Sequence, residues 1–191
     1  DQPERQFESG TLLVQGLPVE KVQKIEITGG DSAVTLSRSG DDSFVLAGRG
    51  GYPASNQKMN NLLNAVLDIR CERKVTDSPE NYADLGVKKD GSDATTVSFY
   101  DSGGERLLGL IKGRTAENSP GSYVRQLGAD SVFLSQEPLR LNSRPLDYVD
   151  RTLLSLSKEN MKWVKVGIKD DTYRLVPGDG EQATLKKVPE G

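Results

Sequence analysis

The chain has 191 residues, of which 25 are basic and 28 are acidic, so its net charge is -3 at neutral pH. This balance excludes the strongly basic surface that binds nucleic acid. The sequence contains no histidine and a single cysteine, which excludes an intrachain disulfide and argues against zinc sites and histidine-dependent catalysis.

Residues 1–17 are expected to be a lead-in to the first strands. Three short segments follow, in which apolar residues occupy alternate positions and Gly- and Asp-containing turns separate one segment from the next. Such alternation between turns is typical of strands that bury one face. We therefore predict a three-stranded antiparallel meander over residues 22–28, 33–38 and 44–46.

An amphipathic helix is predicted next, over residues 55–70, with Ser55 as its N-cap. Its apolar residues recur at helical spacing and form one stripe, made of Met59, Leu62, Leu63, Val66 and Ile69. A stripe of this width buries one side of a helix. We expect this helix to cover one face of the meander.

The middle of the chain predicts a second, shorter helix and two hairpins. Ser78 and Pro79 begin this helix, and Gly86 ends it in the left-handed conformation. Alternating apolar residues and Gly-containing turns then predict four strands, over residues 95–100, 107–111, 123–125 and 132–134. Residues 145–156 are expected to form a short helix or a single helical turn.

The last part of the chain resembles the first meander. Residues 165–168 are similar to 24–27, the pair Arg174-Leu175 follows a turn as Thr35-Leu36 does, and 183–188 predicts a third strand. Two interpretations remain open. These strands are a weak internal repeat whose second copy stops before its helix, or they extend the existing sheet.

The predicted fold class is therefore α+β, with antiparallel β meanders and hairpins and one covering helix. We divide the chain into the lead-in at 1–17, an α+β domain at 18–156, and the strands at 157–191. The last of these segments either completes the same sheet or begins a second, truncated repeat.

Two carboxylates are the first candidates for catalysis. Asp147 and Asp150 are separated by about one helical turn, and Arg151 is adjacent to them. Some hydrolases use two such acids. Helix-end capping and an ion pair with Arg151 explain the same residues without a catalytic role, and no neighbouring polar residue completes a mechanism. We therefore assign neither carboxylate as catalytic.

The nucleophilic side chains are also explained without catalysis. Cys71 follows the apolar stripe of the helix and has no histidine base, so we predict an ordinary buried residue. Ser122 lacks the Gly-x-Ser-x-Gly motif of a nucleophile elbow. Ser55 has Ser-x-x-Lys spacing with Lys58 but is better used as the helix cap. The sequence therefore predicts no catalytic residue and no enzyme.

Metal and phosphate sites are not predicted either. The acidic loops at 41–42, 90–93 and 170–171 lack the spacing of a calcium loop and are expected to be turns. The Gly-rich loop at 48–51 matches neither the dinucleotide nor the P-loop pattern. We therefore assign no metal ligand, no cofactor-binding residue and no cofactor.

Five segments, in chain order, carry a resemblance to a known family. They are V-Q-K-I-E-I at 22–27, G-Y-P-A-S at 51–55, P-E-N-Y-A-D-L-G-V at 79–87, G-S-Y-V-R at 121–125 and P-L-D-Y-V-D-R-T-L-L at 145–154. As an ordered set they resemble the DUF4340 family, a bacterial domain of unknown function, over about residues 10–175. The sequence departs from the family in showing no N-terminal anchor and in having Phe44 where members often have Trp.

The resemblance implies a cellular setting. Members are similar to single-pass proteins with an N-terminal membrane helix, and they are often encoded beside ABC-transporter components of the gliding-motility type. We therefore expect an extracytoplasmic accessory or interaction domain on the periplasmic side, tethered to the inner membrane by an anchor that precedes residue 1. Its expected partner is a protein of a transporter complex, and not nucleic acid.

Two alternative functions remain open. The first is a module that binds cell-envelope polymers or small molecules, which would need a pocket with convergent polar groups. The second is a carboxylate-dependent hydrolase that uses Asp147 or Asp150. A flat apolar patch would instead favour protein contact.

Overall fold

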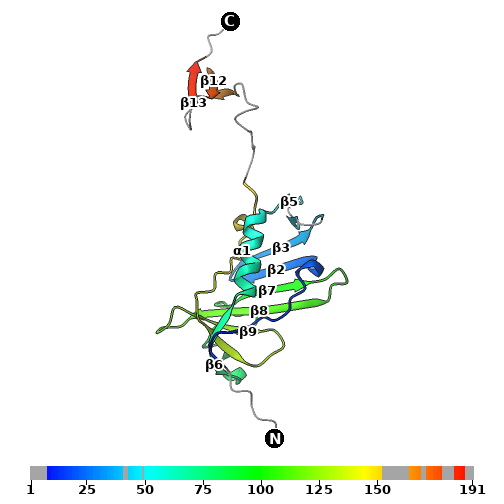
Figure 1. The fold of residues 1–191 in the computed structure, drawn as a ribbon, viewed down its shortest axis with the longest axis vertical. Helices are drawn as coiled ribbons and strands as arrows, with labels where there is room; N and C mark the ends of the chain where they lie inside the picture. The colour runs from blue at the N-terminus through cyan, green and yellow to red at the C-terminus, as the bar shows by residue number, and fades with distance from the viewer. Residues whose placement is uncertain are drawn as a thin grey trace. The chain divides into compact units, whose positions relative to one another are not determined.

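The computed structural model describes residues 8–40, 43–48 and 50–151, together with the strand residues 164–168, 171–177 and 183–187. The chain divides into two compact units, at 1–150 and 151–191. In the described residues, the first unit contains a ten-stranded antiparallel sheet with one α-helix, and the second a three-stranded antiparallel sheet (Figure 1). The predicted α+β fold of antiparallel meanders and hairpins is confirmed.

The large sheet consists of two meanders. In chain order its strands are β1 Thr11–Leu12, β2 Lys24–Gly29, β3 Ser32–Arg38, β4 Phe44–Leu46, β5 Tyr52–Pro53, β6 Arg70–Thr76, β7 Thr95–Tyr100, β8 Arg106–Thr115, β9 Ser122–Gln126 and β10 Val132–Ser135. In the sheet they lie in the order β1-β6-β10-β9-β8-β7-β2-β3-β4-β5. The pairing of β2 with β7 therefore joins the meander β2 to β5 with the meander β7 to β10.

The helical elements of this unit are short. The helix α1 is Asn56–Leu67, and the 3-10 helices are η1 Val19–Lys21, η2 Pro79–Tyr82 and η3 Pro145–Asp147. In the described parts of the chain, no helix is long and apolar enough to cross a membrane.

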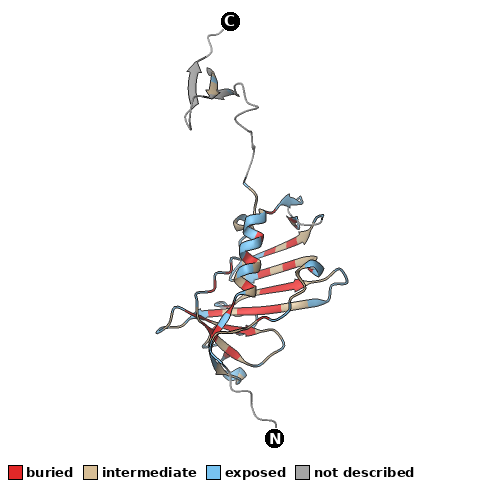
Figure 2. Cartoon of the chain, viewed as in Figure 1, coloured by how far each residue is buried: buried red, intermediate tan, exposed pale blue. Residues whose placement is uncertain are grey.

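The pairing of β2 with β3 follows the alternation of their sequences. Ile25 lies opposite Leu36, and Ile27 lies opposite Val34. All four side chains are at most 4% exposed, whereas Glu26, between the two isoleucines, is half-buried (Figure 2). Because successive strand residues point to opposite faces, this alternation gives the sheet one apolar face.

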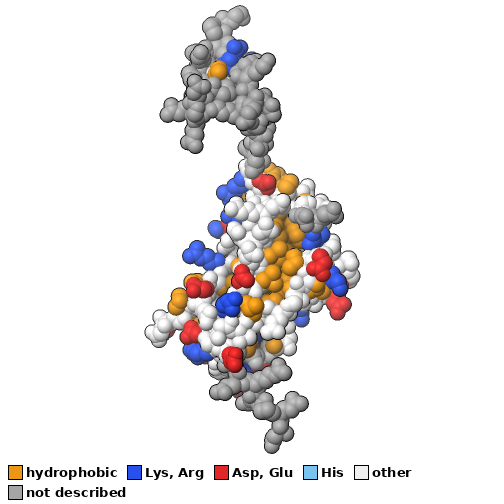
Figure 3. Space-filling model, in the orientation of Figure 1, with side chains coloured by type: hydrophobic (Ala, Val, Ile, Leu, Met, Phe, Trp, Pro, Cys, Tyr) orange, Lys and Arg blue, Asp and Glu red, His pale blue; other side chains and the backbone are white. Residues whose placement is uncertain are grey.

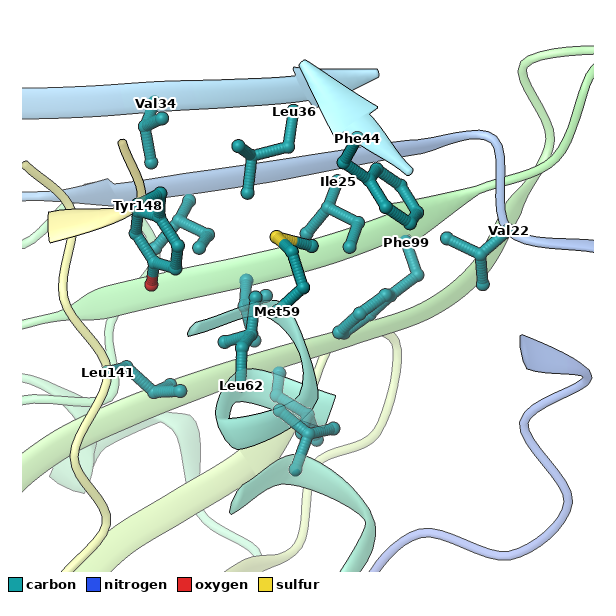
Figure 4. Packing of buried hydrophobic residues seen from close by; sticks show 14 of the residues in the cluster. Val22, Ile25, Val34, Leu36, Phe44, Met59, Leu62, Phe99, Leu141 and Tyr148 are labelled. Atoms are coloured by element: carbon teal, nitrogen blue, oxygen red, sulfur yellow. The ribbon is translucent and has the colours of Figure 1, made fainter. Parts of the chain in front are cut away.

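The helix α1 covers this apolar face, as predicted (Figure 1). Met59, Leu62 and Val66 are 3%, 4% and 0% exposed and belong to the same apolar cluster as the strand residues. Figure 4 shows Met59 pointing from the helix toward Ile25 and Leu36. Complete burial of a side chain of this size stabilises the fold by about 2 kcal/mol, so the three residues of the helix contribute substantially to the stability of the meander.

The structure confirms Ser55 as the N-cap residue of the helix, whereas the C-terminal end differs from the prediction. Ser55 precedes the first helical residue, but its side chain makes no capping hydrogen bond. Its backbone N–H instead donates to the Tyr148 carbonyl at 2.8 Å. The helix ends at Leu67 rather than near residue 70, because β6 begins at Arg70 and pairs with β10. Ile69 is still buried, at 4% exposed.

The strand β6 was not predicted. Its sequence is R-C-E-R-K-V-T, in which charged residues interrupt any apolar alternation. It forms because β10, far along the chain, pairs with it, and β1 pairs with its first residues. The predicted helix after Ser78 is the 3-10 helix η2, and Gly86 follows it with a φ of 69° as predicted. The predicted helix at 145–156 begins as η3, and its residues after 151 lie outside the described part.

The second unit is a three-stranded meander of β11 Val164–Ile168, β12 Asp171–Pro177 and β13 Ala183–Lys187. These strands pair with one another in a sheet of their own. Val164 lies opposite Leu175, and Leu175 lies opposite Leu185. In the first unit Ile25 lies opposite Leu36, and Leu36 opposite Leu46.

The pairing registers of the two meanders coincide. Adding the same number to positions 25, 36 and 46 of the first meander gives positions 164, 175 and 185 of the second. The same addition turns the bounds of β3 into the bounds of β12. Under this shift Val166 corresponds to Ile27. The similarity of 165–168 to 24–27 in the sequence would have matched Val166 with Ile25, two residues away.

Candidate functional site

The carboxylates of the 145–150 segment make different contacts. Asp147 Oδ2 lies 3.2 Å from Nε of Arg144. The sequence predicted an ion pair of this carboxylate pair with Arg151 and did not identify Arg144, which directly precedes the 3-10 turn that ends at Asp147. The backbone N–H of Asp150 donates to the Pro53 carbonyl at 3.0 Å.

A groove runs along one flank of α1. One cavity, of about 360 Å³, is lined by Lys58, Asn61, Leu62, Ala65, Arg140, Asn142, Asp147 and Tyr148. A second cavity, of about 320 Å³, shares Ala65 and Arg140 with the first and continues to Ile69 and Leu139. We call the two cavities together the α1 groove. Its lining includes Asp147 but not Asp150, so it does not combine the two carboxylates that the hydrolase hypothesis requires.

The lining of the α1 groove combines the buried Tyr148 with several polar side chains. The Tyr148 hydroxyl donates to the Asn142 carbonyl at 2.7 Å, and the side chain is 4% exposed. Burial raises the pKa of Tyr148 to about 12, so its phenol stays protonated near neutral pH. Lys58, Asn61 and Arg140 add side-chain N–H donors to the lining of this cavity.

A third cavity lies on the β6 side of the unit. It measures about 330 Å³ and is lined by charged residues of both signs, among them Glu72, Arg73, Asp84 and Arg114. Arg114 Nε donates to the Asp93 carboxylate at 2.9 Å. Its charge is thus partly neutralised, and the cavity favours neither an anion nor a cation. Among the described residues, no group of three His, Cys, Asp or Glu side chains could hold a metal ion.

The opposite flank of α1 is apolar. Leu63 and Leu67 are half-buried and pack against the core. Helical spacing places them on the other side of the buried stripe from Lys58 and Ala65. Leu13 is also half-buried, and its N–H donates to the Ile69 carbonyl just beyond the helix at 2.9 Å. We call Leu13, Leu63 and Leu67 the apolar flank. Figure 3 shows hydrophobic side chains gathered beside the helix, over the strands of the sheet.

Two large hydrophobic residues are exposed within the described part. Tyr52 of β5 is 48% exposed and Leu146 of η3 is 65% exposed. Their two segments are joined, because Ala54 forms an isolated antiparallel bridge with Val149. Both residues therefore expose apolar surface near the bridge between Ala54 and Val149.

Two of the side chains that were considered as nucleophiles, Cys71 and Ser122, are buried in the structure, as was predicted for Cys71. Cys71 is 1% exposed, and burial raises the pKa of its thiol to about 11, so it is protonated and shielded from solvent. Ser122 is 1% exposed, and its backbone N–H donates to Ser135 Oγ at 2.9 Å. In the Gly-rich loop, Gly50 and Gly51 have φ angles of 68° and 67°, as a turn requires.

Four of the five segments that carry the family resemblance meet in two structural joints. In the first joint, residues 53–55 contact residues 148–150 through the bridge and hydrogen bonds already described. In the second, Arg125 Nη2 donates to the Val87 carbonyl at 3.1 Å, and its guanidinium lies 4.2 Å from the centre of the Tyr82 ring. Arg125 is only 9% exposed. These motifs therefore hold the fold together and do not converge on one reactive site.

Sequence reasoning missed the polar lining of the α1 groove. Asn61 was assigned to the solvated side of the helix, and Arg140 and Asn142 lie in a segment with no predicted element. Ala65 could have indicated this cavity from the sequence. It is a small residue beside the apolar stripe, and a small residue at a helix surface leaves room for a cavity.

Comparison with known proteins gives one match. The model of a family described as "Domain of unknown function (DUF4340)" matches residues 45–191. The matched range covers more than three quarters of the chain and includes the second unit, but it begins later than the resemblance found in the sequence, which extended to about residue 10. No curated protein and no solved structure matches the chain.

Proposed function

The chain belongs to the DUF4340 family, a family of unknown function, and on that premise we propose that it is a non-catalytic accessory domain that acts by contacting a protein partner. The proposed setting is extracytoplasmic, on the periplasmic side of the inner membrane, in a complex that contains ABC-transporter subunits. This setting rests on the resemblance of the sequence to family members encoded beside such transporters.

The apolar flank carries the proposal of protein contact. Leu63 and Leu67 expose part of their surface beside a helix whose other residues at that level, Asn60 and Asn64, are polar and exposed. An apolar strip rimmed by polar residues is typical of a protein interface. The structural roles of Cys71 and Ser122 support a domain that does no chemistry.

The test is site-specific photocrosslinking in membranes of the source cell. A photoreactive amino acid replaces Leu63 in one variant and Asn64, on the solvated side of α1, in the matched control. We expect crosslinks from position 63 to ABC-transporter subunits identified by mass spectrometry, and none from position 64. Equal crosslinking from both positions, or recovery of no transporter subunit, would contradict the proposal.

A second candidate function is binding of cell-envelope polymers or small molecules in the α1 groove. Lys58, Asn61 and Arg140 supply polar groups to a lining that also contains apolar side chains such as Leu62 and Ile69, and ligand sites combine groups of both kinds. Titration of the labelled chain with peptidoglycan fragments should then shift amide signals of 58–65 and 140–148. Shifts confined to other residues would exclude this groove as the site. A hydrolase that uses Asp147 or Asp150 is the least supported candidate.

We also propose that the second unit is a partial internal repeat of the first meander. The coincident registers of β2–β3–β4 and β11–β12–β13 support it, as do identical residues at equivalent positions, Leu36 with Leu175 and Leu46 with Leu185. A circular dichroism and hydrogen-exchange study should find β11, β12 and β13 opening as one cooperative unit. Independent opening of one strand would contradict a repeated meander.

A further inference from the structure

Two cations of the α1 groove are unpaired within the described part of the chain. Lys58 and Arg140 both line the cavity of about 360 Å³, and Arg140 also lines the second cavity. Neither side chain makes a hydrogen bond or an ion pair with a described residue. Asn61, about one helical turn after Lys58, adds an amide group to the same lining. The first cavity therefore contains several N–H donors whose hydrogen bonds are available to a ligand.

The carboxylate in this cavity has its own partner. Asp147 lines the first cavity, but its Oδ2 atom lies 3.2 Å from Nε of Arg144, which is not part of the lining. The charge of Asp147 is thus offset from outside the groove, and the positive charges of Lys58 and Arg140 remain uncompensated. Ammonium and guanidinium groups bind carboxylate and phosphate oxygens through charge-assisted hydrogen bonds. The first cavity is therefore complementary to an anion.

The second cavity has no such excess of positive charge. Its two cations are Arg70 and Arg140, and its two carboxylates are Asp68 and Glu137. Arg70 also donates a hydrogen bond to a backbone carbonyl at 3.1 Å. Because the opposite charges in this lining are equal in number, an anion is favoured in the first cavity and not in the second.

Apolar side chains continue from the first cavity into the second. Leu62 lines the first, Ala65 lines both, and Ile69 and Leu139 line the second. A ligand site commonly combines such a wall, which buries the apolar part of the ligand, with a few polar groups that fix its orientation. The position of the unpaired cations therefore gives the groove a direction, with the polar end at Lys58.

We propose that the α1 groove binds a small amphiphile that carries one anionic oxygen group, a carboxylate or a phosphate. The anionic group contacts Lys58 and Arg140 in the first cavity, and the apolar part extends past Ala65 into the second. This inference rests on the second candidate function, binding in the α1 groove, and names the chemistry of the ligand.

Amide chemical-shift titration of the isotope-labelled full chain tests this inference with matched probes. Octanoate and octyl phosphate carry the two anionic groups on the same apolar chain, octanamide is neutral, and acetate lacks the chain. We expect shifts at residues 58–65 and 139–142, with octanoate or octyl phosphate bound about fivefold more tightly than octanamide, since exposed charges contribute modestly. Acetate should bind more weakly than octanoate. The tighter of the two anionic probes identifies the head group.

Substitutions locate the anionic group. Lys58→Gln and Arg140→Gln should each weaken the better anionic probe by about threefold, and the double variant should bind it no more tightly than octanamide. Lys89→Gln removes an exposed cation outside the groove and is the matched control, with no effect expected. Ala65→Leu narrows the wall shared by both cavities and should weaken octanamide as well.

The outcomes separate the ligand class from the groove itself. Equal affinity for octanoate, octyl phosphate and octanamide, or the same loss in Lys89→Gln as in Lys58→Gln, would overturn the inference and leave binding in the groove intact. No shift at 58–65 with any probe would also overturn it. The titration with peptidoglycan fragments then decides by itself whether the groove binds another ligand, so the two failures are distinguishable.

Discussion

The β2–β3–β4 and β11–β12–β13 meanders have the same pairing and different surroundings. In the first, β2 also pairs with β7 and the helix α1 covers one face. In the second, the described strands pair with one another in a three-stranded sheet. The comparison teaches that hairpin turns and alternation set the register, whereas contacts from distant segments decide how deeply the same positions are buried.

The largest expected effect tests this difference directly. Leu36→Ala should destabilise the first unit by about 2–5 kcal/mol, because the side chain is fully buried and the cavity cannot collapse. Leu175→Ala, at the equivalent position, should cost less than about 1.5 kcal/mol. Urea denaturation followed by hydrogen exchange of each unit measures both. Equal destabilisation by the two substitutions would contradict the difference in burial between the two meanders, in which Leu36 is fully buried and Leu175 half-buried.

Arg125 provides the next test, because the first unit depends on long-range joints. Arg125→Ala removes hydrogen bonds to the Val87 and Ala129 carbonyls and leaves buried acceptors without a donor. We expect a loss of about 2 kcal/mol in the first unit and unchanged exchange in β11–β13. Arg125→Lys should recover little, since an ammonium cannot reproduce the planar fork. Destabilisation of both units would show that they unfold together.

The pH dependence of stability sharpens the comparison further. The Cys71 thiol has its pKa raised from 9.0 to about 11 by burial, so the folded state favours the protonated form. The stability from this group is fully present below about pH 9 and is lost as the pH rises through about 11. The urea midpoint of the first unit should therefore fall between about pH 8 and about pH 10.5, and that of Cys71→Ala should fall less. An identical fall in the variant would assign the effect elsewhere.

The smallest expected effect concerns the carboxylate at the groove. Asp147→Asn breaks an ion pair with Arg144, whose side chain is 74% exposed. Exposed pairs contribute little, so we expect a change below about 0.5 kcal/mol in the thermal unfolding of the first unit. Arg144→Gln removes the other partner of the pair and is the matched control, with the same small effect. A loss of stability above about 1.5 kcal/mol in Asp147→Asn, but not in Arg144→Gln, would indicate that Asp147 stabilises the fold through a contact other than this ion pair.

Much of the fold could be predicted from local sequence. The alternation at Ile25, Ile27, Val34 and Leu36 predicts the meander, and the stripe at Met59 predicts its covering helix. The strand β6 could not be predicted, because its residues follow no alternation and only β10 and β1 hold it in place. The C-terminal end of the helix likewise depends on the strand β6, which pairs with β10.

The candidate site residues were also predicted only in part from the sequence. Local reasoning could predict that Cys71 is buried, because it follows an apolar stripe. It did not identify Arg144 as a partner of Asp147, because this contact depends on the short 3-10 turn that follows Arg144. The sequence match of 165–168 to 24–27 differs by two residues from the equivalence given by strand pairing. Sequence similarity compares residue types, whereas the pairing register is fixed by the turn between the strands.

Site-resolved hydrogen exchange on the unmodified chain tests the central claim most directly. We predict the same alternating set of protected amides in β12 as in β3, because the registers coincide, with protection in β3 higher by at least about tenfold, because α1 covers it. A β12 pattern displaced by one residue would contradict the shared register. Equal protection in β3 and β12 would contradict the stabilisation of β3 by α1.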